Sequence, residues 1–104
     1  MREPTYFTLA ALLEGPLHGY AIARRAGQLS DGRVRLAAGT LYAALDRLLD
    51  QGLVAVEGEE VVQGRARRYY RITAAGGEAV RAEARRLHEA AAVVARLTVA
   101  EAAP

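Results

Sequence analysis

The feature of this chain that most constrains its fold is an apolar stripe at helical spacing near the middle of the sequence. The stripe consists of Leu41, Ala44, Leu45, Leu48 and Leu49. Residues that recur three and four positions apart lie on one face of an α-helix, and such a face is stable only when it packs against other elements. Gly52 follows where a left-handed residue commonly ends a helix. The pattern therefore predicts a helix over residues 38–51 that packs on the core of a small domain.

Two further helices are predicted ahead of this stripe. The first is indicated by apolar residues at helical spacing, namely Tyr6, Leu9, Ala10 and Leu13. Gly15-Pro16 then supplies a stop signal, so this helix is expected over residues 4–14. Small and apolar residues recur over residues 18–28, which predicts a second helix. Ser30-Asp31-Gly32 is typical of a turn, and residues 33–36 are expected to form an irregular link to the third helix.

A β-hairpin is predicted after the third helix. Residues 53–57 and 68–73 are rich in β-branched and aromatic side chains, and Gly58 and Gly64 lie between them. We therefore expect two strands joined by a long, basic tip. Thr73 is a suitable N-cap for a last helix, although Gly76 and Gly77 weaken its first turn.

The last helix has a second apolar stripe. Its members, spaced alternately four and three residues apart, are Val80, Ala84, Leu87, Ala91 and Val94. This alternation is typical of a coiled-coil seam, and such a seam needs a partner. Packing against its own domain is one way to cover it, but we expect a contact between two copies of the chain. Residues 98–104 are weakly patterned and are expected to fray.

The order helix, helix, turn, helix and hairpin is that of a winged helix-turn-helix. The predicted fold class is therefore α+β, mostly α-helical, with a C-terminal dimerisation helix. We expect a DNA-binding domain over residues 1–75 and a dimerisation helix and tail over residues 76–104. In this fold the third helix enters the major groove of DNA, and the hairpin lies along the neighbouring backbone.

The distribution of charge agrees with this fold better than the total charge does. The formal net charge is only +2, but residues 61–73 hold four arginines and no acid, while three glutamates lie just upstream at 57, 59 and 60. Arginine suits contacts with phosphates. All fourteen basic side chains are arginine, which equally fits the coding bias of a GC-rich genome.

Four motifs closely resemble those of the PadR family of bacterial transcriptional regulators. They are Leu12-Leu13-Glu14-Gly15-Pro16-Leu17-His18-Gly19-Tyr20; Gly39-Thr40-Leu41-Tyr42 with Leu45, Arg47 and Leu48; Gly52-Leu53-Val54; and Arg68-Tyr69-Tyr70-Arg71-Ile72-Thr73 with Gly76. The resemblance spans residues 9–80 and implies a dimeric repressor that binds an operator with dyad symmetry and dimerises through one C-terminal helix. Ala43 stands where the family usually has proline, and Ala37-Ala38 replaces its usual Ser or Thr with Pro. A lost N-cap costs about 1 kcal/mol, which weakens the start of the third helix.

The candidate DNA-binding residues come from three parts of the predicted fold. They are Gly39, Thr40, Tyr42, Arg47, His18, Tyr20, Arg65, Arg67 and Tyr69. Thr40 and Tyr42 lie in the first turn of the third helix, where side chains reach phosphates or base edges. For Tyr42 the alternative is packing against the second helix. Arg47 lies one turn further on and either contacts DNA or pairs with a nearby acid such as Asp50.

The remaining candidates surround the start of the second helix and the hairpin. His18 is expected to cap the second helix, where helix amides favour a phosphate, and Tyr20 lies either in the core or on a phosphate. Arg65 and Arg67 are expected to contact phosphates or the minor groove because no acid shields the tip, the alternative being a solvated turn. Alternation places Tyr70 in the core and leaves Tyr69 to position the hairpin.

Other classes of function lack the residues that they need. The chain has no cysteine, only two histidines and no Gly-rich phosphate loop, so we predict no catalytic residues, no metal site and no cofactor. No apolar run approaches the ~20 residues of a membrane span, and a cytoplasmic, nucleoid-associated protein is expected. The expected partners are an operator duplex and a second copy. A small aromatic effector is implied by the family resemblance alone, and a protein-interaction module is the main alternative function.

Overall fold

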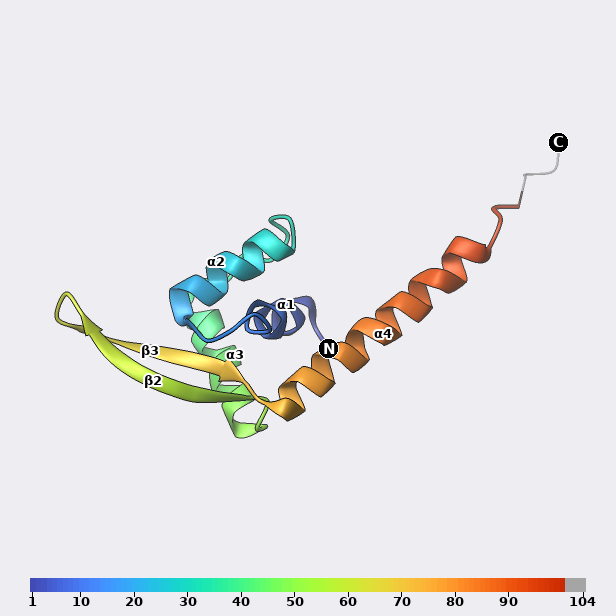
Figure 1. Ribbon diagram of the computed structural model, residues 1–104. Helices are drawn as coiled ribbons and strands as arrows, with labels where there is room; N and C mark the ends of the chain where they lie inside the picture. Colours follow the sequence, from blue (N-terminus) through green and yellow to red (C-terminus); the bar gives the residue numbers. More distant parts are fainter. Residues whose placement is uncertain (101–104) are drawn as a thin grey trace.

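The computed structural model describes residues 1–100 and contains four helices and three strands. In chain order these are α1 (Glu3–Ala11), β1 (Leu17–His18), α2 (Gly19–Leu29), α3 (Ala38–Asp50), β2 (Val54–Val62), β3 (Arg65–Ile72) and α4 (Ala74–Arg96). Figure 1 shows α1, α2 and α3 gathered together, with the β2–β3 hairpin projecting to one side and α4 to the other. The predicted fold, a mostly helical winged helix-turn-helix with a C-terminal helix, is confirmed. Residues 101–104 of the tail that was expected to fray lie outside the described residues.

The core lies where the three short helices meet the base of the hairpin and the start of α4. It is formed by Leu9, Leu12, Ile22, Leu41, Leu45, Leu48, Val54, Tyr70 and Val80, with smaller residues between them. Four of the five residues in the predicted stripe of α3 are buried, and the fifth, Leu49, is half-buried against the core. Tyr70 is the aromatic residue of β3 that faces inward. The exposed face of α3 is therefore its opposite side.

Both ends of α3 follow from local chemistry. Ala37 is at the N-cap position, and its methyl side chain cannot accept a hydrogen bond from the first turn. The start of α3 therefore lacks a side-chain cap, as expected. At the other end Gly52 has a φ of +73°, and the Leu53 amide donates to the Leu48 carbonyl at 2.9 Å. This left-handed glycine ends the helix as predicted and turns the chain into β2.

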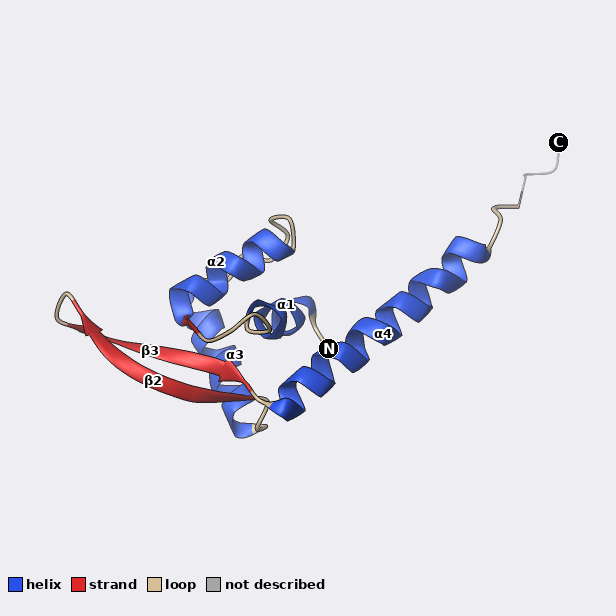
Figure 2. Ribbon diagram, viewed as in Figure 1, coloured by secondary structure: helices blue, strands red, loops and turns tan. Residues whose placement is uncertain are grey.

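The hairpin is longer, and its tip shorter, than the sequence predicts (Figure 2). Its strands are paired as far as Val62 and Arg65, so that only Gln63 and Gly64 form the turn. Both turn residues have positive φ, 53° and 78°, as the tightest two-residue hairpins require. The predicted long tip is therefore wrong: Gly58 belongs to a strand, next to a register shift at Glu57.

A third strand was not predicted. β1 consists only of Leu17 and His18, which pair with Tyr70 and Tyr69 of β3, so the sheet order is β1-β3-β2. This pairing attaches the start of α2 to the hairpin. Two residues are too few to give a period-two pattern in the sequence.

Thr73 alone separates β3 from α4, and it connects three elements. Its hydroxyl donates to the Gly52 carbonyl at 2.7 Å and accepts from the Gly76 amide at 3.1 Å, which makes it the predicted N-cap. Its own amide donates to the Leu53 carbonyl at 3.1 Å. The end of α3, the start of β2 and the first turn of α4 are thereby held together.

The two halves of α4 lie in different environments. Val80 is buried and packs into the core, and Ala84 is half-buried, whereas Leu87 and Val94 are 43% and 72% exposed. In Figure 1 the C-terminal half projects away from the rest of the fold. This corrects part of the predicted seam: Val80 is occupied within its own domain, because the first turns of α4 pack against α1 and β3.

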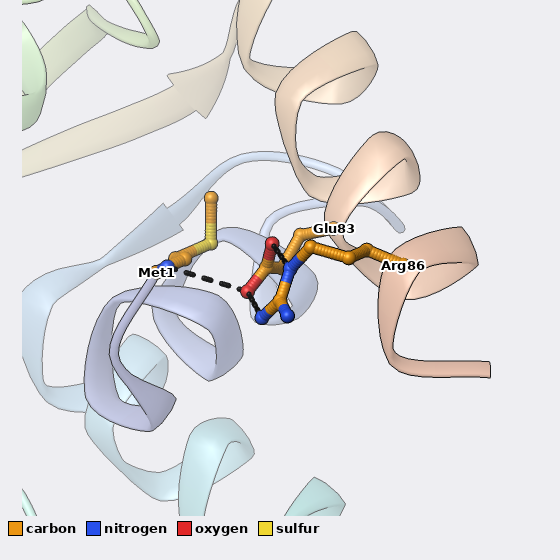
Figure 3. A network of polar contacts seen from close by, with 3 residues as sticks. All are labelled: Met1, Glu83 and Arg86. Atoms are coloured by element: carbon orange, nitrogen blue, oxygen red, sulfur yellow. Dashed lines mark hydrogen bonds and ion pairs between the residues drawn. The ribbon is translucent and has the colours of Figure 1, made fainter. Parts of the chain in front are cut away.

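A polar network also holds α4 against the start of the chain (Figure 3). The Glu83 carboxylate accepts hydrogen bonds from Arg86 at 2.9 and 2.8 Å and lies 3.3 Å from the amino group of Met1. These contacts, led by the Arg86 hydrogen bonds, lower the pKa of Glu83 to about 2, although partial burial opposes them. Glu83 therefore stays ionised and keeps α4 next to the N-terminal segment.

Candidate nucleic-acid interface

A broad hollow lies between the hairpin, the first turn of α2 and α3. Its volume is about 510 Å³, and most of its lining surface is polar. Five of the predicted DNA-binding residues line it: His18, Tyr20, Tyr42, Arg65 and Arg67. The β1–β3 pairing accounts for this assembly, because it places the start of α2 beside the hairpin. Side chains from three separate segments thus border one surface.

The exposed face of α3 continues this surface. Gly39 and Thr40 are exposed at its start, and Arg47 is exposed further along. Within residues 1–100 Arg47 takes part in no ion pair, so the alternative of pairing with Asp50 is not observed. Asp46 is also exposed here and was not singled out from the sequence, although it lies one turn beyond Tyr42 on the same helix.

Tyr42 both packs and remains accessible. Its ring lies against Gly19 in the first turn of α2, and 46% of the residue is exposed. The two alternatives considered for Tyr42, contact with DNA and packing on α2, are therefore compatible in this geometry. Tyr20 is 74% exposed, which excludes the core position considered for it.

The acids of β2 neutralise part of the charge of β3. Arg68 pairs with Glu59 at 3.2 Å, and Arg71 pairs with Glu57 at 3.1 Å. Since the strand register brings the upstream glutamates back beside the arginines, the prediction of an unshielded basic segment is correct only in part. Arg65 is in no ion pair within the described chain.

Arg67 lies in a more mixed environment than Arg65. It faces Glu60 across the strands, but the pair is not within ion-pair distance in the described part of the chain. It is half-buried, and both it and Arg65 line the hollow. These two guanidinium groups are thus the free cations nearest to the tip.

A cluster of rings joins the hairpin to α2. His18 stacks on Tyr20 with ring centroids 6.4 Å apart and meets the edge of Tyr69 at 5.5 Å. The Tyr69 hydroxyl donates to Glu60 at 2.5 Å, and this hydrogen bond raises the pKa of Tyr69. Tyr69 is half-buried in this cluster, where it contacts His18 of β1 and Glu60 of β2.

His18 is the N-cap of α2, as expected. Its Nδ1 accepts from the Ala21 amide at 3.3 Å, which leaves Nε2 to carry the proton of the neutral ring. Burial and, to a smaller extent, the charge of Arg67 lower the pKa of His18, while Glu60 opposes them. Over residues 1–100 no three His, Cys, Asp or Glu side chains are grouped closely enough to hold a metal ion.

The link ahead of α3 contributes less free charge than its sequence suggests. Arg33 pairs with Glu3 at 2.8 Å, and the Arg35 guanidinium donates to the Gly32 carbonyl at 3.4 Å. The cations of the interface are therefore chiefly those of the hairpin and α3.

Comparison with known proteins decides the family. The model of the "Transcriptional regulator PadR-like family" matches residues 8–82, which is most of the chain and includes the hollow and all of α3. The chain belongs to this family. The sequence prediction of a PadR-like transcriptional regulator rather than an enzyme is thereby confirmed.

This PadR-like protein resembles a regulator of known sequence and several of known structure. Over 64 residues it is 47% identical to transcriptional regulator Rv3488 of Mycobacterium tuberculosis, a match that covers 62% of this chain and 59% of that protein. A PadR family regulator from Eggerthella lenta has 32% identity and a TM-score of 0.71, over 88% of this chain and 78% of the other. Bacillus subtilis PadR, solved in complex with operator DNA, has 17% identity and a TM-score of 0.69, over 99% and 53% of the two chains, and shows a shared fold. In the described part of this PadR-like chain, none of the helices has the length and apolar character needed to cross a bilayer.

Proposed function

We propose that this protein is a homodimeric repressor that binds a double-stranded operator in the cytoplasm, at the nucleoid. The observation that carries the proposal is that Tyr42, Arg65 and Arg67 border one hollow beside the exposed face of α3. In the proposed complex the first turn of α3, with Gly39 and Thr40, enters the major groove. Arg65 and Arg67 contact the flanking phosphates.

The polarity and charge of this surface support DNA as the partner. Arg65, Arg67 and Arg47 have no carboxylate partner among residues 1–100, so binding a phosphate breaks no ion pair. The structure of Bacillus subtilis PadR with operator DNA supports the same kind of partner for this chain. Free arginines can bind either the phosphates of a duplex or an acidic patch on a protein. The dependence of binding on salt and on DNA sequence distinguishes these two partners.

The dimer is proposed to form through the exposed half of α4. Leu87, Ala91 and Val94 continue the spacing of a coiled-coil seam beyond the last turn that packs on the domain. A second copy presents the same stripe, and a two-fold axis between them makes the contact self-complementary. Two recognition helices related in this way read half-sites about 10 base pairs apart, one turn of DNA.

Relief of repression by a small aromatic compound is the part of the proposal that rests most on the family. A small, mostly apolar hollow of about 150 Å³ lies between α2 and α3 and is lined by Tyr20, Leu36, Leu41 and Tyr42, among others. An apolar space of this size suits one aromatic ring. A compound bound there would touch Tyr42, so we expect it to weaken duplex binding.

Duplex binding tests the proposal directly. We would measure fluorescence anisotropy with a duplex taken from upstream of the protein's own gene, at two salt concentrations, with an unrelated duplex of equal length as control. The proposal expects sequence-selective binding that weakens steeply as salt rises. A folded dimer that binds neither duplex would instead indicate a protein-interaction module.

A further inference from the structure

Gly19 is a glycine that the backbone does not require. It is the first residue of α2, and it is not among the residues with positive φ. A glycine in an ordinary helical conformation gives up helix propensity that alanine would provide. The reason for glycine at this position must therefore lie in what surrounds its α-carbon.

The surrounding group is the phenol of Tyr42. A methyl group on Gly19 would lie 2.8 Å from Cζ and 3.1 Å from Cε1 of that ring, and closer still to the hydroxyl oxygen. Carbon atoms in contact are normally about 3.5–4.0 Å apart, so ring and methyl group cannot both occupy these positions. The ring rests directly on the first turn of α2 because Gly19 has no side chain.

The kind of neighbour decides what a side chain here would change. The atoms above Gly19 belong to the end of a half-exposed side chain that turns about two bonds, so they can move away. A methyl group at Gly19 should consequently move the Tyr42 ring while leaving the helices in place. The substitution therefore changes the position of the Tyr42 phenol, which lines the hollow next to His18 and Tyr20.

We propose that Gly19 is a positioning residue for DNA binding. Because Gly19 has no side chain, the Tyr42 ring lies against the first turn of α2 at the rim of the hollow. The position of this ring determines duplex affinity, and no contact between Gly19 and DNA is required. The inference rests on the proposed function, in which Tyr42 contacts the duplex. It assigns a role to a residue that has no functional group of its own.

A double-mutant cycle tests this role. Gly19→Ala should keep the wild-type unfolding midpoint but weaken duplex binding about tenfold, the loss expected when a hydrogen bond to a phosphate is misplaced. Tyr42→Ala should weaken binding to a similar extent. Adding Gly19→Ala to Tyr42→Ala should then change nothing, because the displaced ring is already absent.

Gly27→Ala is the matched control. It lies in the same helix, where a methyl group meets only the Val34 carbonyl at an ordinary 3.6 Å, so duplex affinity should be unchanged. Wild-type affinity of Gly19→Ala, or additive losses in the double variant, would overturn the inference. If Gly19→Ala alone fails to fold while the double variant folds, the cost lies in stability, and the inference is likewise wrong.

A readout without DNA separates this inference from the proposed function. Nuclear Overhauser contacts between the Gly19 α-protons and the Tyr42 ring protons measure directly whether the ring lies against α2. Gly19→Ala should change the contacts of the ring with α2. If the contacts are present but the wild-type protein binds no duplex, the proposed function is wrong, whereas the packing of the Tyr42 ring on Gly19 is confirmed. If duplex binding is present and the contacts are absent, the positioning role fails alone.

Discussion

The carbonyl oxygen of Leu53 lies directly against the α-carbon of Gly76, where β2 begins beside the first turn of α4. A Cβ atom on Gly76 would also lie 2.8 Å from Cγ1 of Ile72 and 3.0 Å from the carbonyl carbon of Leu53. Gly76 is buried, and these neighbours are mostly backbone, so they cannot turn aside. This close approach fixes the place at which α4 leaves the domain.

Gly76→Ala should therefore destabilise the fold. Forcing a methyl group into packed surroundings costs about 1–3 kcal/mol, and chemical denaturation would measure this loss as a lower midpoint. Gly77→Ala is the control, because nothing lies within 4 Å of its added methyl group. It should be neutral or stabilise the helix by up to about 1 kcal/mol. Equal effects of the two substitutions would show that helix propensity, and not the contact with Leu53, governs the site.

The free arginines of the hairpin should determine the electrostatic part of duplex binding. Arg65→Gln and Arg67→Gln should each weaken binding to operator and unrelated duplexes alike. Each should also reduce the slope of log affinity against log salt by about 0.9, one phosphate contact. Arg71→Gln, whose charge is engaged by Glu57, should have a smaller effect. A loss confined to the operator would instead indicate that Arg65 or Arg67 reads bases.

Leu87→Glu should produce a folded monomer. Leu87 is 43% exposed on the projecting half of α4, so a carboxylate there does not disturb the core but is incompatible with an apolar contact between copies. Sedimentation should show the monomer, and operator affinity should fall about a hundredfold because the two half-sites are no longer bound together. Arg85→Gln changes the net charge by the same amount on the opposite face and should remain dimeric. A dimer that survives Leu87→Glu would exclude this stripe as the interface.

The histidine that caps α2 should titrate below the ordinary histidine value of 6.5, because burial and Arg67 both lower its pKa. Below pH 6.5 the unfolded chain then takes up this proton more readily than the folded chain. The contribution of His18 to folding stability should therefore be fully present above pH 6.5 and be lost as the solution is acidified. Proton NMR would follow the His18 ring. Arg67→Gln should raise the midpoint and Glu60→Gln should lower it. A wild-type midpoint at or above 6.5 would contradict this account.

The helices could be predicted because each has a pattern longer than two turns. The buried stripe of α3 needed only spacing, and the caps at His18 and Thr73 needed only the residue type just before an apolar run. β1 has no such pattern, since its two residues become a strand only by pairing with β3. The short turn could not be predicted because it requires a positive φ at Gln63, and glutamine rarely adopts this conformation. The sequence therefore indicated a long tip.

Side-chain partners were less predictable because they depend on register and on packing in three dimensions. The pairs of Glu57 with Arg71 and Glu59 with Arg68 follow from the shift in strand register at Glu57, which no local pattern announces. Val80 and Leu87 share one helical stripe, yet Val80 is in the core and Leu87 faces solvent. Spacing identifies a face, but the length of the neighbouring elements decides how much of that face they cover.

The position of Thr73 gives α4 a mechanical role. Because this single residue separates β3 from α4 and its hydroxyl donates to Gly52 at the end of α3, no long linker lies between α4 and the end of α3. Because Thr73 links the start of α4 to the end of α3, we expect a tilt imposed on the far end of α4 to move the C-terminal end of α3 with it.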